Sequence, residues 1–229
     1  MRNWLDDQLD HRLLLPIQSK QLQYEIKQDR IILSWAFANE EVLTMDAPIE
    51  AVALIDAEKI NEISVAQWSL KQLASEFPEN LEHIQLSFEA EEISGAYYHY
   101  SHGLKKHDGN CQRIAHGHRS RIQIWQNGTR DNDLESIWAE RWADIYIGSE
   151  EDLVSISSDA KQQMHFAYDA PQGHFELTLP QRVCYMMNSD TTVECISAHI
   201  ANVLQSENPT SSITVKAFEG LHKGAISEI

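Results

Sequence analysis

Histidines gather near the middle of the chain in a pattern that could hold a metal ion. His116 and His118 stand two residues apart. Successive side chains of a strand alternate between its two faces, so both imidazoles point to the same side. Gly117 between them leaves room for another group to approach. With His102 upstream, they form three imidazoles around an open fourth position, which is typical of catalytic rather than structural zinc.

A single His-x-His pair also occurs at the ends of surface strands that bind no metal. The interpretation as ligands therefore depends on His102 and on Cys111, which lies between His102 and the pair. His99 has the opposite strand parity to His102, so it is excluded from the ligand set. His107, in the intervening loop, is a reserve ligand.

These residues resemble the motif of the 6-pyruvoyltetrahydropterin synthase and 6-carboxytetrahydropterin synthase family, whose fold is the T-fold (tunnelling fold). The family pattern is a histidine, then a cysteine, then His-Gly-His. This chain has one residue more than the family between Cys111 and His116. The resemblance implies a Zn²⁺ ion held by His102, His116 and His118.

A second motif lies near the N-terminus. Leu9-Asp10-His11 resembles the Leu-Asp-His motif of the same family, whose Asp and His act with the cysteine in proton transfer. The resemblance implies catalytic roles for Cys111, Asp10 and His11. A carboxylate beside a histidine fixes its tautomer and raises its basicity. On the residues alone, a polar pair in an amphipathic helix is the simpler interpretation.

Two residues near the C-terminus are expected to bind substrate. Glu219 falls on a late predicted strand, where the family has a glutamate that binds the pterin ring. A carboxylate can accept two parallel hydrogen bonds from an amino-pyrimidinone edge. Thr192, at the start of the preceding predicted helix, is the second expected substrate-binding residue. An exposed strand residue is the alternative for Glu219, and Glu89 matches it in the first half of the chain.

The charge of the chain limits its partners. The 229 residues carry 18 basic and 35 acidic side chains, for a net charge of −17. This acidity argues against nucleic acid and against an anionic membrane as main partners. Basic residues nevertheless concentrate over residues 99–130, which predicts a local positive patch for a small anionic substrate, such as a phosphate ester. An equally weighted alternative is that these basic residues are ordinary solvated charges on loops and strands. The basic residues concerned are Lys105, Lys106, Arg113, Arg119, Arg121 and Arg130.

The cysteines indicate a reducing compartment. The chain has three cysteines, with no framework spacing and no apolar signal segment, so we expect a cytoplasmic protein. Cys184 and Cys195 lie in apolar surroundings and are expected to be core thiols. No apolar run approaches the roughly 18 residues of a membrane span.

Hydrophobic periodicity predicts helices, strands and an internal duplication. The duplicated units are expected over residues 1–93 and 94–229. The resemblance to the pterin synthase family implies that each is an α+β T-fold half with antiparallel sheets and helices on one face. The first half lacks the opening hairpin of that fold, so we expect an extra N-terminal hairpin in the natural protein or its relatives. Pro48 corresponds to Pro180, Val65 to Val193, and Phe88 to Phe218. The predicted helices are 2–15, 64–77, 134–153, and one that starts at 191–194. The predicted strands include short ones within 22–55, then 83–90, 175–179, an apolar one over 183–187, and 213–219.

The resemblance implies a zinc-dependent lyase that acts on 7,8-dihydroneopterin triphosphate. The product would be 6-pyruvoyl- or 6-carboxytetrahydropterin, of which the second, on the route to queuosine, is favoured. A homo-oligomer is expected, because T-fold proteins close their open sheet edges by assembling barrels. Two alternatives stay open: a divergent T-fold protein that binds a pterin or purine without catalysis, and a metal hydrolase that uses the same three histidines.

Overall fold

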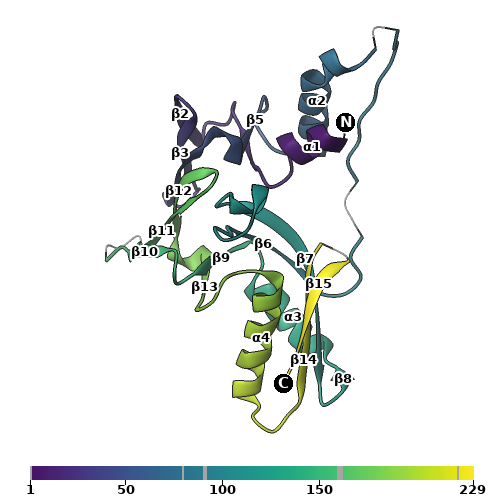
Figure 1. The fold of residues 1–229 in the computed structure, drawn as a ribbon, viewed down its shortest axis with the longest axis vertical. Helices are drawn as coiled ribbons and strands as arrows, with labels where there is room; N and C mark the ends of the chain where they lie inside the picture. The colour runs from purple at the N-terminus through teal and green to yellow at the C-terminus, as the bar shows by residue number, and fades with distance from the viewer. Residues whose placement is uncertain (1, 79, 90–91, 159–161, 221) are drawn as a thin grey trace.

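The computed structural model of the chain is built from two large β-sheets that meet near its middle (Figure 1). The structure describes residues 2–78, 80–89, 92–158, 162–220 and 222–229. Within them, one sheet has six strands, another has seven, and two further strands form a separate pair. The fold is α+β.

The N-terminal part of the chain supplies five strands and two helices. Its elements are α1 (Arg2–Gln8), β1 (Leu13–Pro16), β2 (Leu22–Lys27), β3 (Arg30–Ala36), β4 (Val42–Pro48), β5 (Val52–Ile55) and α2 (Glu62–Gln72). The rest of the chain supplies β6 (Tyr97–His102), β7 (His116–Gln126), β8 (Thr129–Arg130), α3 (Asn132–Arg141), β9 (Ile145–Ser149), β10 (Leu153–Ile156), β11 (Gln163–Ala170), β12 (Gly173–Pro180), β13 (Cys184–Met187), α4 (Val193–Glu207), β14 (Ile213–Glu219) and β15 (Lys223–Glu228).

The seven-stranded sheet carries α3 and α4 on one face, as Figure 1 shows below the centre of the molecule. Its strand order is β13-β9-β6-β7-β14-β15, with β8 beside β7. Apolar residues alternate along the strands and recur at helical spacing along α4, so burial of the two apolar faces holds them together. Helices on one face were expected. The sheet is not purely antiparallel, because β9 pairs in parallel with β13 and β6. No helix in the described residues has both the length and the apolar character needed to cross a membrane.

The six-stranded sheet joins the two halves of the chain. Its order is β10-β11-β12-β4-β3-β2, and the antiparallel pair of β4 and β12 lies at its centre. Leu33, Met45, Phe166, Phe175 and Leu177 are among the residues buried on its inner face. The core therefore links N-terminal and C-terminal strands in one sheet.

The predicted helix over residues 2–15 is wrong beyond Gln8. His11 has φ 57°, in the left-handed region, which a right-handed helix cannot include. The chain turns there, and residues 13–16 form β1, which pairs in parallel with β5. Pro16 therefore ends a strand, not a helix.

The predicted strand over residues 83–90 is also wrong for residues 83–89, which have no strand structure; Ala90 lies outside the described residues. Ile84, Leu86 and Phe88 are half-buried in alternation, as a strand would have them. They line a cavity beside α2. The segment keeps the apolar pattern, but residues 83–89 pair with no strand in the described part of the chain.

The predicted helix over residues 134–153 is wrong beyond Arg141, where α3 ends, and residues 145–149 form the strand β9. The remaining predicted elements are close to those observed. Thr192 is the N-cap of α4, and its Oγ1 accepts from the backbone N–H of Cys195 at 3.3 Å. The predicted helix 64–77 is α2, which begins earlier because Asn61 and Ser64 form a capping box. The strands expected at 175–179, 183–187 and 213–219 are β12, β13 and β14.

The order of elements recurs along the chain. A hairpin strand that ends in proline, a short 3₁₀ turn, a strand and a capped helix follow one another at Pro48 and again at Pro180. Met45 pairs with Leu177, and each lies at the same position before its proline. This recurrence agrees with the expected duplication, which stays a prediction together with the boundary between residues 93 and 94.

The loop between β6 and β7 is tied to the β11–β12 hairpin. The hydroxyl of Tyr168 donates to the carbonyl oxygen of Gln112 at 2.7 Å, and the backbone N–H of Gln172 donates to Gln112 Oε1 at 3.2 Å. A Cβ on Gly103 would lie 2.0 Å from Tyr168 Oη, so only glycine lets the loop pass this close. The hairpin thus fixes the loop that carries Cys111.

Replacing Tyr168 by Phe should destabilise the protein by about 1–3 kcal/mol, because the buried carbonyl of Gln112 would lose its hydrogen bond. Urea unfolding followed by circular dichroism measures the change. Tyr24 is exposed, so Tyr24→Phe is the control and should shift stability by less than about 0.5 kcal/mol. Equal stability of the two variants would show that the Tyr168 hydroxyl does not hold the loop.

Candidate functional site

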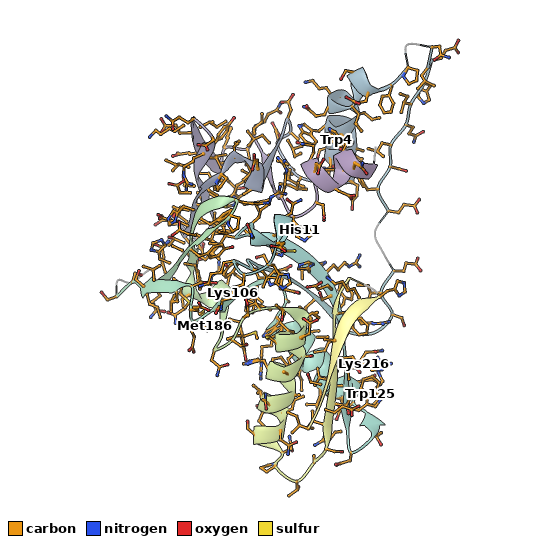
Figure 2. All side chains as sticks on the ribbon, viewed as in Figure 1. Trp4, His11, Lys106, Trp125, Met186 and Lys216 are labelled. Carbon is orange, nitrogen blue, oxygen red and sulfur yellow. The ribbon has the colours of Figure 1, made fainter. Side chains whose placement is uncertain are left out.

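Four histidines meet where the N-terminal segment reaches the start of β7. His102 lies opposite His116 across the β6–β7 ladder, with ring centroids 4.4 Å apart. His118 lies 5.1 Å from His102 and 5.2 Å from His116. His11 approaches from the turn after α1, 4.9 Å from His116, and Figure 2 shows it beside β7. Residues far apart in sequence therefore form one cluster.

Two of these imidazoles are held by backbone carbonyls. His102 Nδ1 lies 3.0 Å from both the carbonyl oxygen and Oγ1 of Thr191, and His116 Nδ1 lies 2.8 Å from the carbonyl oxygen of Arg113. A carbonyl can only accept, so each Nδ1 carries the proton and each Nε2 keeps a lone pair. Both Nε2 atoms are buried and have no hydrogen-bond partner.

Burial keeps these two rings neutral. It lowers the pKa of His102 well below 6.5, and the adjacent His116 and His118 lower it further. It lowers the pKa of His116 to about 3. A buried acceptor without a partner is costly, and a neutral imidazole with a free lone pair is the form that binds a metal. The pair fits a metal ion that accepts both lone pairs.

His11 belongs to a different chain of contacts. Its Nδ1 lies 2.7 Å from Asp10 Oδ2, and its Nε2 lies 3.5 Å from Cys111 Sγ. Carboxylate, imidazole and thiol thus follow one another in contact. Burial, and to a lesser degree Glu219, raises the pKa of the Cys111 thiol, so the sulfur holds its proton at neutral pH and has an imidazole placed to receive it.

Two histidine sets can be drawn from this cluster. His11, His116 and His118 place one ring nitrogen each within 4.8 Å of one another. The expected set replaces His11 by His102. His102 has an unpartnered Nε2, whereas both nitrogens of His11 already have partners, so the unsatisfied acceptors favour His102. His11 instead contacts Asp10 and Cys111.

The cluster opens into a cavity of about 410 Å³. Glu219, at the end of β14, points a largely buried carboxylate into it and pairs with Lys223 Nζ at 2.6 Å. Arg119 adds a second cation. The cavity therefore combines a carboxylate–imidazole–thiol chain, a largely buried carboxylate and two cationic side chains. Its lining residues are Asp10, His11, Leu104, His107, Cys111, His116, Gly117, His118, Arg119, Glu219, Gly220 and Lys223.

Three residues considered in the sequence analysis are not part of the histidine set. His107, the reserve ligand, lines the cavity but is not in the histidine set above. His99 lies on the opposite face of β6 and pairs with Asp144 at 3.5 Å, in line with its parity. Thr192 does not line the cavity and caps α4 instead, so its role in substrate binding stays a prediction.

The expected positive patch is wrong. Lys105 pairs with Glu151 and Asp152, Lys106 pairs with Glu151, and Arg130 pairs with Glu135. Arg121 lies over the ring of Phe218. Strand alternation and local carboxylates disperse charges that are close in sequence, and of the six expected residues Arg119 alone lines the cavity.

Sequence reasoning missed three residues that shape the site. Thr191 and Arg113 hold two histidines through their carbonyls, which no residue type can signal. Lys223 lies opposite Glu219 in the β14–β15 hairpin, around Gly220. A hairpin turn at Gly220 was the one available signal, because it would place residues 219 and 223 side by side.

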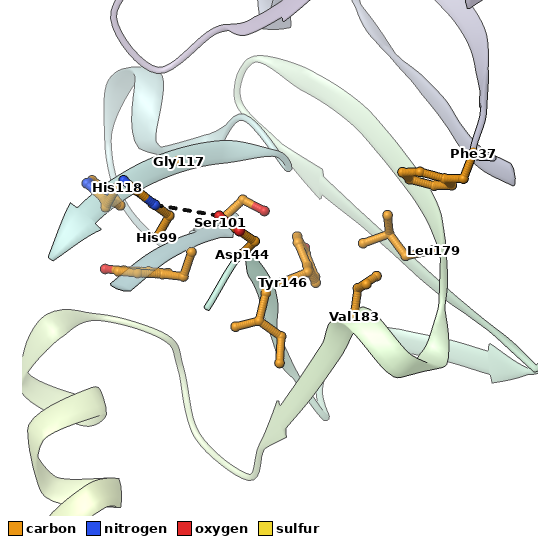
Figure 3. A pocket seen from close by; sticks show the side chains of 11 residues that line it. Phe37, His99, Ser101, Gly117, His118, Asp144, Tyr146, Leu179 and Val183 are labelled. Atoms are coloured by element: carbon orange, nitrogen blue, oxygen red, sulfur yellow. Dashed lines mark ion pairs between the residues drawn. The ribbon is translucent and has the colours of Figure 1, made fainter. Parts of the chain in front are cut away.

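A second cavity, of about 530 Å³, lies on the reverse face of the β6–β7 ladder (Figure 3). His99, Ser101 and Gly117 face it from β6 and β7. Phe37, Tyr146, Leu179 and Val183 make much of its wall apolar, and the His99–Asp144 pair lies at its polar side. It shares Gly117 and His118 with the first cavity, but Asp10, His11 and Cys111 do not line it.

Comparisons with known proteins give structural matches alone. No family model and no curated protein matches the sequence. Among solved structures, 6-pyruvoyl tetrahydropterin synthase from Plasmodium falciparum matches with 12% identity and a TM-score of 0.43 over 58% of this chain and 91% of its own. A catalytic-residue mutant of the Plasmodium vivax enzyme matches with 14% identity and a TM-score of 0.42, over the same shares. Similarity at this level does not establish a shared activity.

Without metal, the folded protein should lose stability as the pH falls from about 6.5 toward 3. Between these pH values both histidines bind a proton in the unfolded chain but stay neutral in the folded protein. Their contribution to the free energy of unfolding is therefore complete above pH 6.5 and is lost as the pH falls below it. Each group contributes a slope of up to about 1.4 kcal/mol per pH unit.

Urea unfolding of the metal-free protein at several pH values measures this slope. His116→Gln should reduce it, because glutamine does not titrate. An equal slope in the variant and the unmodified protein would contradict the neutral, buried state of His116.

Proposed function

We propose that the chain is a zinc-dependent lyase of the pterin synthase type, acting on 7,8-dihydroneopterin triphosphate. One observation carries the proposal: a single cavity brings together His116 with its unpartnered Nε2, a thiol–imidazole–carboxylate chain and a largely buried carboxylate, and the ring of His102, also with an unpartnered Nε2, packs against His116. The resemblance of the sequence motifs to the pterin synthase family supplies the substrate. The T-fold and the duplication belong to the same proposal.

His102, His116 and His118 would hold the zinc ion. The unpartnered Nε2 atoms of His102 and His116 fit this role, since both lone pairs are buried and the proton of each ring is fixed on Nδ1. Zinc in such a site acts as a Lewis acid that makes substrate hydroxyl groups and the adjacent C–H bond more acidic.

Proton transfer would fall to Asp10, His11 and Cys111, which are in contact with one another. His11 Nε2 takes a proton from the Cys111 thiol or from the substrate, and Asp10 stabilises the imidazolium that forms. Once deprotonated, Cys111 is a second base. Because His11 contacts both Asp10 and Cys111, it would pass the proton between neighbouring groups.

Glu219 would accept the amino-pyrimidinone edge of the pterin. Its carboxylate pairs with Lys223 in the free protein, so binding would exchange one cationic donor for two neutral parallel ones. Lys223, released from Glu219, would stabilise the triphosphate as it leaves, together with Arg119, whose guanidinium lies 4.8 Å from the ring centroid of Tyr97. The six dispersed basic residues of the expected patch have no such role, apart from Arg119.

Several finer statements complete the proposal. The favoured product is 6-carboxytetrahydropterin, on the way to queuosine. The proposed setting is the cytoplasm, with a small pterin triphosphate as partner and a homo-oligomer as the working form. Neither nucleic acid nor a membrane is a proposed partner, because the net charge is −17.

The direct test is a product assay. The zinc-loaded protein is incubated with 7,8-dihydroneopterin triphosphate, and products are separated by chromatography with mass detection. A 6-carboxy- or 6-pyruvoyltetrahydropterin peak supports the proposal and names the product. Zinc at one ion per chain without any product would favour a second function, binding of a pterin without conversion. The protonated thiol of Cys111 and the closed Glu219–Lys223 pair favour that second function.

Cys111→Ala should lower turnover by about 10²- to 10⁴-fold while zinc remains bound at the same stoichiometry, because the thiol serves as a base and not as a ligand. Steady-state rates and atomic absorption measure the two quantities. Cys195→Ala, on α4, is the matched control. Turnover that survives in Cys111→Ala would remove the thiol from the mechanism.

His102→Ala should weaken zinc binding by more than about 100-fold, since losing even an outer partner of a ligand can cost that much. Competition with a coloured chelator measures the affinity. His99→Ala, on the other face of β6, is the control and should have no effect. If His11→Ala weakened binding as strongly and His102→Ala did not, the ligand set would be His11, His116 and His118.

A further inference from the structure

Arg113 contacts both parts of the split site. Its Nη1 donates to the carbonyl oxygen of Asp10 at 2.9 Å, and its own carbonyl oxygen accepts from His116 Nδ1 at 2.8 Å. We propose that Arg113 is a positioning residue, which holds the Asp10–His11 turn in register with the metal-binding histidines. This inference rests on the function proposed above and adds a residue that the motifs do not include.

The turn that carries His11 needs such support. It connects α1, a helix of 7 residues, to the 4-residue strand β1, and His11 itself has a left-handed backbone. Asp10 is exposed and His11 is half-buried. A short helix contributes little stability of its own. The contact of His11 with Cys111 at 3.5 Å therefore depends on what holds the turn from outside.

Arg113 stands on a fixed base. The preceding Gln112 receives hydrogen bonds from Tyr168 and Gln172, and the backbone N–H of Leu104 donates to the carbonyl oxygen of Cys111 at 3.0 Å. Arg113 is 5% exposed, so packing limits the conformations of its side chain. Because the loop is fixed, the hydrogen bond from Arg113 can hold the Asp10–His11 turn at a fixed distance from it.

The charge of Arg113 strengthens the contact. Burial, and secondarily the neighbouring Arg12, lowers the pKa of Arg113 to about 10, so the guanidinium keeps its charge at neutral pH. A hydrogen bond from a charged donor is worth more than a neutral one. The planar, directed donors of arginine also fix geometry in a way that a lysine ammonium does not.

A second contact supports the same interface but is weaker. Asn110 Nδ2 donates to the carbonyl oxygen of Asp6 at 3.3 Å, from the exposed edge of the loop. This bond holds the end of α1 and not the turn. Arg113 is thus the described residue that bonds directly to the Asp10–His11 backbone from the cysteine loop.

The test compares Arg113→Met and Arg113→Lys with Arg121→Met. Arg121 is also on the β7 side of the site, but its guanidinium lies 4.3 Å from the ring centroid of Phe218. In both Arg113 variants, hydrogen exchange of the peptide over residues 5–13 should accelerate. Zinc affinity should stay within about twofold of the unmodified protein, because the backbone carbonyl that orients His116 remains.

Turnover should fall by about 10- to 100-fold in Arg113→Met through kcat, with KM changed less, because a displaced base is a lost transition-state contact. In a His11→Ala background, Arg113→Met should cause no further loss. Additive losses in the double variant, or equal losses in Arg121→Met, would overturn the positioning role. Arg113→Lys is the control for folding. It keeps the charge and should retain the thermal unfolding midpoint, so any loss of turnover in it does not come from unfolding.

A readout without turnover separates this inference from the proposed function. The rate at which iodoacetamide alkylates Cys111, followed by peptide mass spectrometry in zinc-free protein, reports its contact with His11. Arg113→Met and His11→Ala should change that rate by the same factor, and the double variant by no more. If the unmodified protein makes no tetrahydropterin but this pattern holds, the proposed function fails and the positioning role stands. An unchanged rate in Arg113→Met overturns the positioning role whatever the activity.

Discussion

Two buried imidazole nitrogens without partners are the constraint on which the site depends. Backbone carbonyls fix the protons of His102 and His116 on Nδ1, so each ring keeps a buried Nε2 lone pair without a hydrogen-bond partner. Burial also keeps both rings neutral. Such an arrangement is costly in an empty protein and favourable around a cation. The surrounding loops and strands can be understood as the structure that maintains it.

The second requirement is that distant segments meet. The histidines proposed to bind metal lie on β6 and β7, whereas Asp10 and His11, the proposed acid–base pair, lie beyond the end of α1. Pairing of β4 with β12 joins the N-terminal strands to the C-terminal ones in a single sheet. The cysteine loop, fixed by Tyr168, then bridges the remaining gap. The fold thus assembles within one chain a site whose parts lie about one hundred residues apart.

Much of the site could be predicted from sequence because its chemistry depends on residue type and strand parity. The same-face placement of His116 and His118 and the exclusion of His99 follow from the two-residue period of a strand. The meeting of His11 with Cys111 came from the family motif alone. The ligands' carbonyl partners could not be predicted, since every residue has a carbonyl. The positive patch failed because carboxylates distant in sequence, such as Glu151, neutralise the lysines. The helix beyond Gln8 failed because periodicity does not reveal a left-handed turn at His11.

The most direct test of the central claim is diffraction from zinc-grown crystals at the zinc absorption edge. The account predicts one strong anomalous peak per chain, in contact with Nε2 of His102, Nε2 of His116 and the ring of His118, with His11 and Cys111 Sγ outside the coordination sphere. A peak coordinated by His11 in place of His102, or hydrogen-bonded waters on both Nε2 atoms with no peak, would contradict it.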